Sequence, residues 1–130
     1  MTDELRDKYY GYTINEAIEL IPGELPVDAV GLWQIVPKGR DGFGLSGEAL
    51  DDFIRRAIAA LLEADAVPVR HVHGSDYEWD IQRQYGSERE QIIEAILAEW
   101  HTMPDDPLIL CGKGVWFARP DPSIKYVNVD

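Results

Sequence analysis

Three stretches of the chain place apolar residues every three or four positions, which is the spacing of a helix with one buried face. The predicted helices span residues 13–21, 46–64 and 87–101. The first and third begin with the pattern of a capping box, Thr13 with Glu16 and Ser87 with Glu90. Pro22 follows the first stretch and cannot continue a helix, so we expect that helix to end there.

The remaining apolar runs are typical of strands. They span residues 29–36, 67–73, 77–85, 108–118 and 126–129. The run at 29–36 is apolar on both faces apart from Gln34, which favours a central strand covered on both sides. Gly112-Lys113-Gly114 interrupts the fourth run and permits either a tight hairpin or a bulge within one strand.

The second and third runs are separated by Gly74-Ser75-Asp76, which predicts a hairpin. A three-residue loop pairs Val69 with Ile81, Arg70 with Asp80, His71 with Trp79 and His73 with Tyr77. A two-residue loop shifts the pairing by one residue and sets His71 against Asp80. Because that shift moves Trp79 and Ile81 to the wrong face of the strand, we expect the first register.

From residue 29 onward the expected order is strand, helix, strand, strand, helix, strand. This order is that of a ferredoxin-like βαββαβ core, an antiparallel sheet with two long helices on one face. We therefore predict a single α+β domain over residues 1–130, with an extra N-terminal helix and a C-terminal strand. The other sheet face would carry Trp33 and Trp116, so we expect a homodimer or the first helix to cover it.

Charge and composition narrow the functional classes. The chain of 130 residues has a net charge of −12, which would repel phosphate backbones and argues against general nucleic-acid binding. The longest nearly apolar stretch, 57–62, is too short to span a bilayer, and residues 1–8 lack the apolar centre of a signal peptide. Cys111 is the single cysteine, so no intrachain disulfide can form. These features favour a cytoplasmic protein, and the charge permits a basic protein partner.

The segment from Lys38 to Gly47 is the strongest candidate for ligand binding. Gly42, Gly44 and Gly47 match the glycine spacing of dinucleotide-binding loops, but the segment lies in the wrong place relative to the expected strand and the hairpin that follows. A simpler hypothesis is a small anionic ligand held near free N–H groups at a helix start. Its ligand-binding residues would be Lys38, Arg40, Gly42, Gly44, Ser46 and Gly47, whereas the competing interpretation is a solvated loop.

Two further constellations are weaker. His71 and His73 share one face of a strand, as two ligands of one metal would, but a zinc site needs a third ligand on that face. We expect both histidines to pack against aromatic rings and to bind no metal. Cys111 with His101 has the chemistry of a nucleophile and its base, but we expect Cys111 to be an inert thiol in the core.

No catalytic constellation and no cofactor motif emerges from the sequence. The prediction is a non-enzymatic, acidic, cytoplasmic binding or accessory domain that acts through a protein partner or by self-association. An inhibitor that neutralises a basic toxin or enzyme is one specific form of it. The alternative is a domain or enzyme that binds a small anionic molecule through residues 38–47.

Overall fold

The computed structural model describes residues 5–25, 29–71, 78–104, 114–119 and 125–128. Its helices are α1 (Ile14–Leu20), α2 (Leu32–Pro37), α3 (Gly47–Glu63) and α4 (Arg89–His101), with a 3-10 turn η1 (Ile21–Glu24) and a π-helical turn η2 (Lys38–Gly42). Its strands are β1 (Val30–Gly31), β2 (Val67–His71), β3 (Glu78–Ile81), β4 (Trp116–Ala118) and β5 (Lys125–Asn128).

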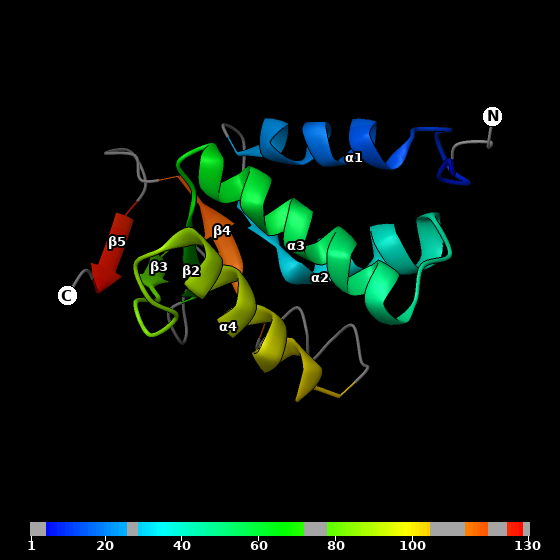
Figure 1. Cartoon of the computed structure of the whole chain (residues 1–130). Helices are drawn as coiled ribbons and strands as arrows, with labels where there is room; N and C mark the ends of the chain where they lie inside the picture. Colours follow the sequence, from blue (N-terminus) through cyan, green and yellow to red (C-terminus); the bar gives the residue numbers. More distant parts are fainter. Residues whose placement is uncertain (1–4, 26–28, 72–77, 105–113, 120–124, 129–130) are drawn as a thin grey trace.

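The strands form one sheet in the order β1-β4-β2-β3-β5 (Figure 1). The first four are antiparallel to their neighbours, and β5 runs parallel to β3. The mixed α+β class is therefore confirmed. The ferredoxin-like topology is not, because that arrangement sets the first and third strands side by side, whereas β1 lies at the edge next to β4.

The prediction of a central strand at 29–36 is wrong for most of its length. Only Val30 and Gly31 pair with β4, and the chain then turns into α2. Leu32, Ile35 and Val36 are buried in α2, and they have the i, i+3, i+4 spacing of one helical face. The side chain of Gln34 accepts a hydrogen bond from the Gly31 N–H at 2.8 Å and so caps the start of this helix.

The three predicted helices are present. At α1 the capping box forms, because the Thr13 hydroxyl accepts the Glu16 N–H at 3.1 Å and the Glu16 carboxylate accepts the Thr13 N–H at 2.9 Å. At α4 the predicted box does not form. That helix begins after Glu88, and the Ser87 N–H donates to the Gln91 side chain at 3.2 Å.

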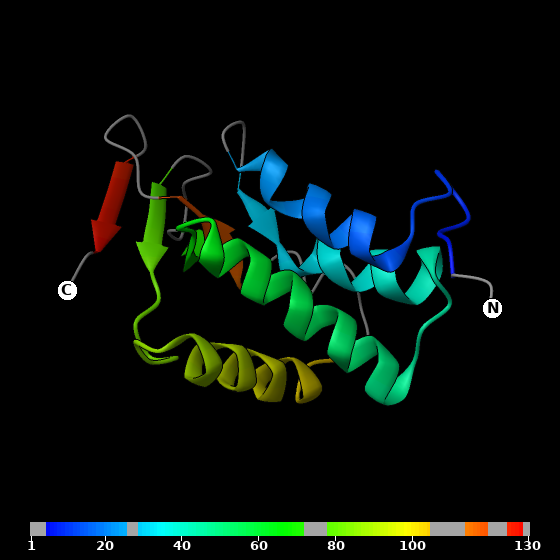
Figure 2. The ribbon, with the colours of Figure 1, turned by 45° about the horizontal axis from the view of Figure 1, so that its top comes forward.

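The main core lies around α3, which has α1 on one side and α4 on the other (Figure 2). Ile54, Ala57, Ile58 and Leu61 of α3 are 0% exposed. Burial of the apolar stripe that the sequence predicted for this helix therefore accounts for the central place of α3.

The hairpin register agrees with the prediction. Val69 pairs with Ile81, Arg70 with Asp80 and His71 with Trp79. The alternative that set His71 against Asp80 is thereby excluded. His73, Tyr77 and the connecting loop lie outside the described residues, as do Cys111 and the Gly112-Lys113 part of the glycine turn.

The second face of the sheet is buried only in part, because Val67, Ile81 and Trp116 remain partly exposed. Val69 is 0% exposed and Ala118 is 3% exposed, and both belong to a separate small cluster packed against Trp116. Helix α1 packs with the main core beside α3, so it is not the predicted cover of this face. The homodimer that was predicted to cover this face stays a prediction.

Candidate functional site

The segment before α1 is a tight turn organised by Asp7. One oxygen of its carboxylate accepts the N–H groups of Tyr9 and Tyr10 at 2.8 and 2.7 Å, and the other accepts the Tyr12 N–H at 3.1 Å. The Asp7 N–H donates in turn to the Tyr12 carbonyl at 2.8 Å. A short carboxylate that satisfies successive backbone N–H groups is the usual way to hold such a turn in one conformation.

The same contacts keep Asp7 charged. Loss of hydration around the carboxyl would raise its pKa, but the hydrogen bonds from Tyr10, Tyr9 and Tyr12 outweigh this and the pKa lies below the ordinary value. The positive charge of Lys38 acts in the same direction. The turn therefore carries a fixed negative charge at neutral pH.

The turn displays its tyrosine side chains to solvent. Tyr9 is 63% exposed, Tyr10 is 78% exposed and Tyr12 is 39% exposed. The rings of Tyr10 and Tyr12 lie 5.8 Å apart between centroids, and the Lys8 ammonium lies 5.2 Å from the centroid of the Tyr9 ring. Since the turn is fixed by the Asp7 carboxylate, these large apolar rings are presented on an ordered backbone.

Opposite the turn lies η2, which continues α2 in a wider helical form. Pro37 has no N–H to donate to the carbonyl four residues back, and the π-helical spacing begins directly after it. Gly39 lets η2 approach α3, because a Cβ at this position would lie 2.8 Å from Leu50 and 2.8 Å from Phe53. The Lys8 N–H donates to the Gly42 carbonyl at 2.9 Å and ties the N-terminal turn to η2.

Between these elements lies a cleft of about 780 Å³, within the range of sites that bind ligands or side chains. Tyr9, Tyr10 and Tyr12 line it from the turn, and Lys38 and Asp41 line it from η2. The rest of the wall is formed by residues of α1, η1, β1 and α2 together with Phe43. The cleft thus combines aromatic rings with charged groups of both signs.

The residues that the sequence singled out are divided by the structure. Lys38 and Gly42 line the cleft, and the half-buried Arg40 does not. Gly44, Ser46 and Gly47 lie beyond η2, in the connection to α3 and its first turn. The glycine pattern follows a helical turn and not a strand, so its context is not that of a dinucleotide-binding loop.

The turn at residues 5–12 was not predicted from the sequence. The apolar residues of segment 5–12 follow neither helical nor strand spacing, so no element was predicted there. A local signal was present. An aspartate followed within five positions by Tyr9, Tyr10, Gly11 and Tyr12 indicates a side-chain-capped turn with several exposed rings.

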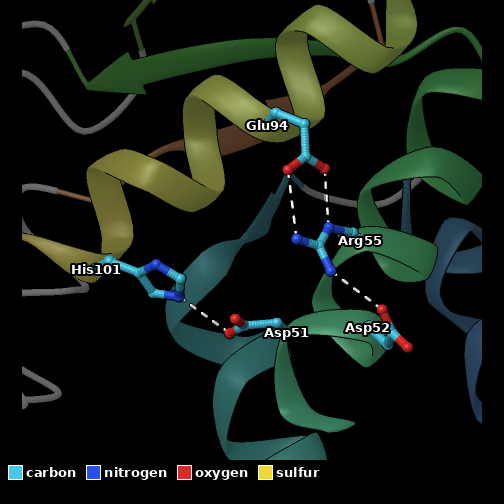
Figure 3. A network of polar contacts seen from close by, with 5 residues as sticks. All are labelled: Asp51, Asp52, Arg55, Glu94 and His101. Carbon is cyan, nitrogen blue, oxygen red and sulfur yellow. Dashed lines mark hydrogen bonds and ion pairs between the residues drawn. The ribbon is translucent and has the colours of Figure 1, made fainter. Parts of the chain in front are cut away.

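His101 belongs to a polar network between α3 and α4 (Figure 3). Its Nε2 lies 3.0 Å from the Asp51 carboxylate. Arg55 donates to Glu94 at 2.8 Å and to Asp52 at 3.1 Å, and the hydrogen bond with Glu94 raises the arginine pKa further. The network joins the two helices, and His101 is already engaged there. The pairing with Cys111, which the sequence disfavoured, involves a residue outside the described part of the chain.

A second polar cluster joins the sheet to α4. Arg70 of β2 donates to Glu99 at 2.6 Å and to the Tyr85 hydroxyl at 2.9 Å, and that hydroxyl donates to Glu99 at 2.7 Å. Burial and the bond to Glu99 raise the pKa of Tyr85. Arg70 therefore forms its ion pair with a helix carboxylate rather than with Asp80, the neighbour across the strand.

Among the described residues, no three His, Cys, Asp or Glu side chains gather in a way that could hold a metal ion. No helix in the described ranges combines the length and apolar character needed to cross a membrane.

Compared with protein-family models, curated proteins and solved structures, the chain matches none.

Proposed function

We propose that the chain is a non-enzymatic, acidic, cytoplasmic binding domain that acts through a protein partner. The contact would be made by a surface at the N-terminal end, here called the tyrosine surface. It comprises Leu5, Tyr9, Tyr10, Tyr12 and Leu20, next to the cleft.

The observation that carries the proposal is the concentration of exposed apolar groups at this one place. Among the residues whose side chains the structure describes, every exposed large hydrophobic residue lies between Leu5 and Leu20. Tyrosine is enriched among the residues that dominate binding energy at protein interfaces, because its ring buries a large area and its hydroxyl stays hydrated. Because Asp7 already holds the turn in one conformation, less conformational entropy is lost when a partner binds.

Charge favours a basic partner over a second copy of the chain. Arg6, Arg55 and Arg70 form ion pairs with acidic side chains of the same chain, while the total charge remains −12. Two copies would repel each other at long range, whereas a basic protein would be attracted. An inhibitor of a basic toxin or enzyme is one form that such a domain can take.

Site-specific photo-crosslinking in the cells that make the protein tests this proposal. A benzophenone amino acid replaces Tyr10 in one variant and the exposed Arg89 of α4 in a control. We expect a discrete adduct from position 10, heavier than two copies of the chain or different from them in peptide composition, and none from position 89. An adduct made of two copies of the chain would assign self-association, and equal adducts from both positions would refute the proposal.

The alternative is a small anionic ligand at Lys38, and one observation favours it. Lys38 does line the cleft, although Asp7 and Asp41 line it as well and oppose an anion. Under this alternative, citrate, phosphate or a nucleotide raises the melting temperature, and the double variant Lys38→Ala, Arg40→Ala loses that gain. Under the protein-partner proposal, none of these anions shifts the melting temperature.

A further inference from the structure

We propose that the cleft receives a cationic side chain from the partner, and that a guanidinium group fits it best. This inference rests on the proposed function, since it names the chemistry that the tyrosine surface recognises. The occupant is an arginine of a basic protein segment.

The first support is the charge of the walls. Two carboxylates, those of Asp7 and Asp41, line the cleft against one ammonium group, that of Lys38. Asp7 cannot easily become neutral, because the backbone N–H groups that donate to it stabilise its charged form. Among the described residues, one of its oxygens accepts only the Tyr12 N–H, and a carboxylate oxygen has room for a second donor.

The second support comes from the aromatic rings. The faces of tyrosine rings attract cations, and sites that combine aromatic faces with a carboxylate are a known means of recognising ammonium and guanidinium groups. The molecule already contains one such contact, with the Lys8 ammonium 5.2 Å from the Tyr9 ring centroid. Tyr10 and Tyr12 follow in the same turn, with their ring centroids 5.8 Å apart. Tyr10 is 78% exposed and Tyr12 is 39% exposed.

Shape and order favour guanidinium over ammonium. Guanidinium is planar, is less strongly hydrated, stacks on aromatic rings and can donate to a carboxylate at the same time. The cleft of about 780 Å³ accommodates an arginine side chain together with its flanking backbone. Because Asp7 and the bond from Lys8 to Gly42 fix the two walls, little ordering is required when the group enters.

A pair of matched peptides tests the inference on the full chain. The probe is Gly-Gly-Arg-Gly-Gly with blocked ends, and its control carries citrulline, the neutral isostere of arginine. Binding is followed by NMR through the backbone amides of Tyr9, Tyr10, Tyr12 and Phe43. We expect saturable chemical-shift changes with the arginine peptide. The citrulline peptide should bind about two- to fivefold more weakly, which is the effect typical of an exposed cation–aromatic contact.

Variants separate the two recognition elements. Tyr10→Leu keeps an apolar side chain but removes the ring, and Asp41→Asn removes one wall charge, so each should weaken binding by about two- to fivefold. Tyr10→Phe keeps the ring and should restore the binding that Tyr10→Leu loses. Glu90→Gln, which makes the same charge change on the exposed start of α4, should have no effect.

The outcomes distinguish this inference from the proposed function. Equal shifts with both peptides, or no saturable shift with the arginine peptide, would overturn the cationic occupant. A discrete partner adduct from position 10 would then leave the protein-binding function standing with a different occupant. Loss of both results would remove the function and the inference together.

Discussion

Helix α3 and the turn at residues 5–12 use their side chains in opposite ways. In α3 the apolar stripe faces inward, with Ile54, Ala57 and Ile58 at 0% exposure, and Arg55 is engaged by carboxylates of the same chain. In the turn the backbone is held by Asp7, while Tyr9 and Tyr10 are 63% and 78% exposed. The difference indicates that α3 supplies stability, whereas under the proposed function the turn would supply the contact with a partner.

The largest expected effect is a loss of stability in α3. Ile58→Ala removes a fully buried side chain of α3 and should lower the free energy of unfolding by about 2–5 kcal/mol. Tyr10→Ala is the matched control in the turn, and as a surface change it should stay within about 0.5 kcal/mol. Urea denaturation followed by circular dichroism measures both. Equal losses would mean that the tyrosine turn is part of the folding core.

A smaller effect is expected at the start of α1, which connects the turn to the core. Thr13→Ala removes the hydroxyl that accepts the Glu16 N–H and should cost about 1 kcal/mol of unfolding free energy. Ser46→Ala at the start of α3 is its control, because the Ser46 side chain makes no capping bond. The same denaturation experiment compares them. A larger loss for Ser46→Ala would contradict the capping geometry described here.

The most local effect concerns Asp7 and pH. Its pKa is lower in the folded chain than the ordinary value of 3.8, so the charged form stabilises the turn above that value. As the pH falls through the folded pKa, this stabilisation is lost, and the amides of Tyr9, Tyr10 and Tyr12 should exchange hydrogen faster relative to those of α3. Asp7→Asn should show the fast exchange already at neutral pH. Unchanged relative exchange down to pH 2 would show that Asp7 does not hold the turn.

The parts that could be predicted from the sequence share a regular pattern. The helices at 13–21, 46–64 and 87–101 repeat apolar residues with helical spacing, and burial of that face decides their position. The β2–β3 register followed from keeping Trp79 and Ile81 on one face of the hairpin. In these segments the local pattern and the tertiary packing favour the same structure.

The parts that could not be predicted lack such a pattern or are ambiguous. The run at 29–36 is apolar on both faces, and a short run of this kind suits a buried strand and a buried helix equally. The Gly31 and Gln34 cap was the local feature that favoured the helix. The cleft depends on the backbone hydrogen bond from Lys8 to Gly42. This bond joins segments that are distant in the sequence, so it cannot be predicted from a local pattern.

The most direct test of the division between core and contact surface is hydroxyl-radical footprinting inside cells and on the purified chain. Tyr10 of the tyrosine surface is compared with His101, whose half-exposed ring at the end of α4 provides the control. We predict that Tyr10 is oxidised readily in the purified chain and is protected in the cell, while the oxidation of His101 is the same in both. Equal oxidation of Tyr10 in the two settings would contradict a protein partner on the tyrosine surface.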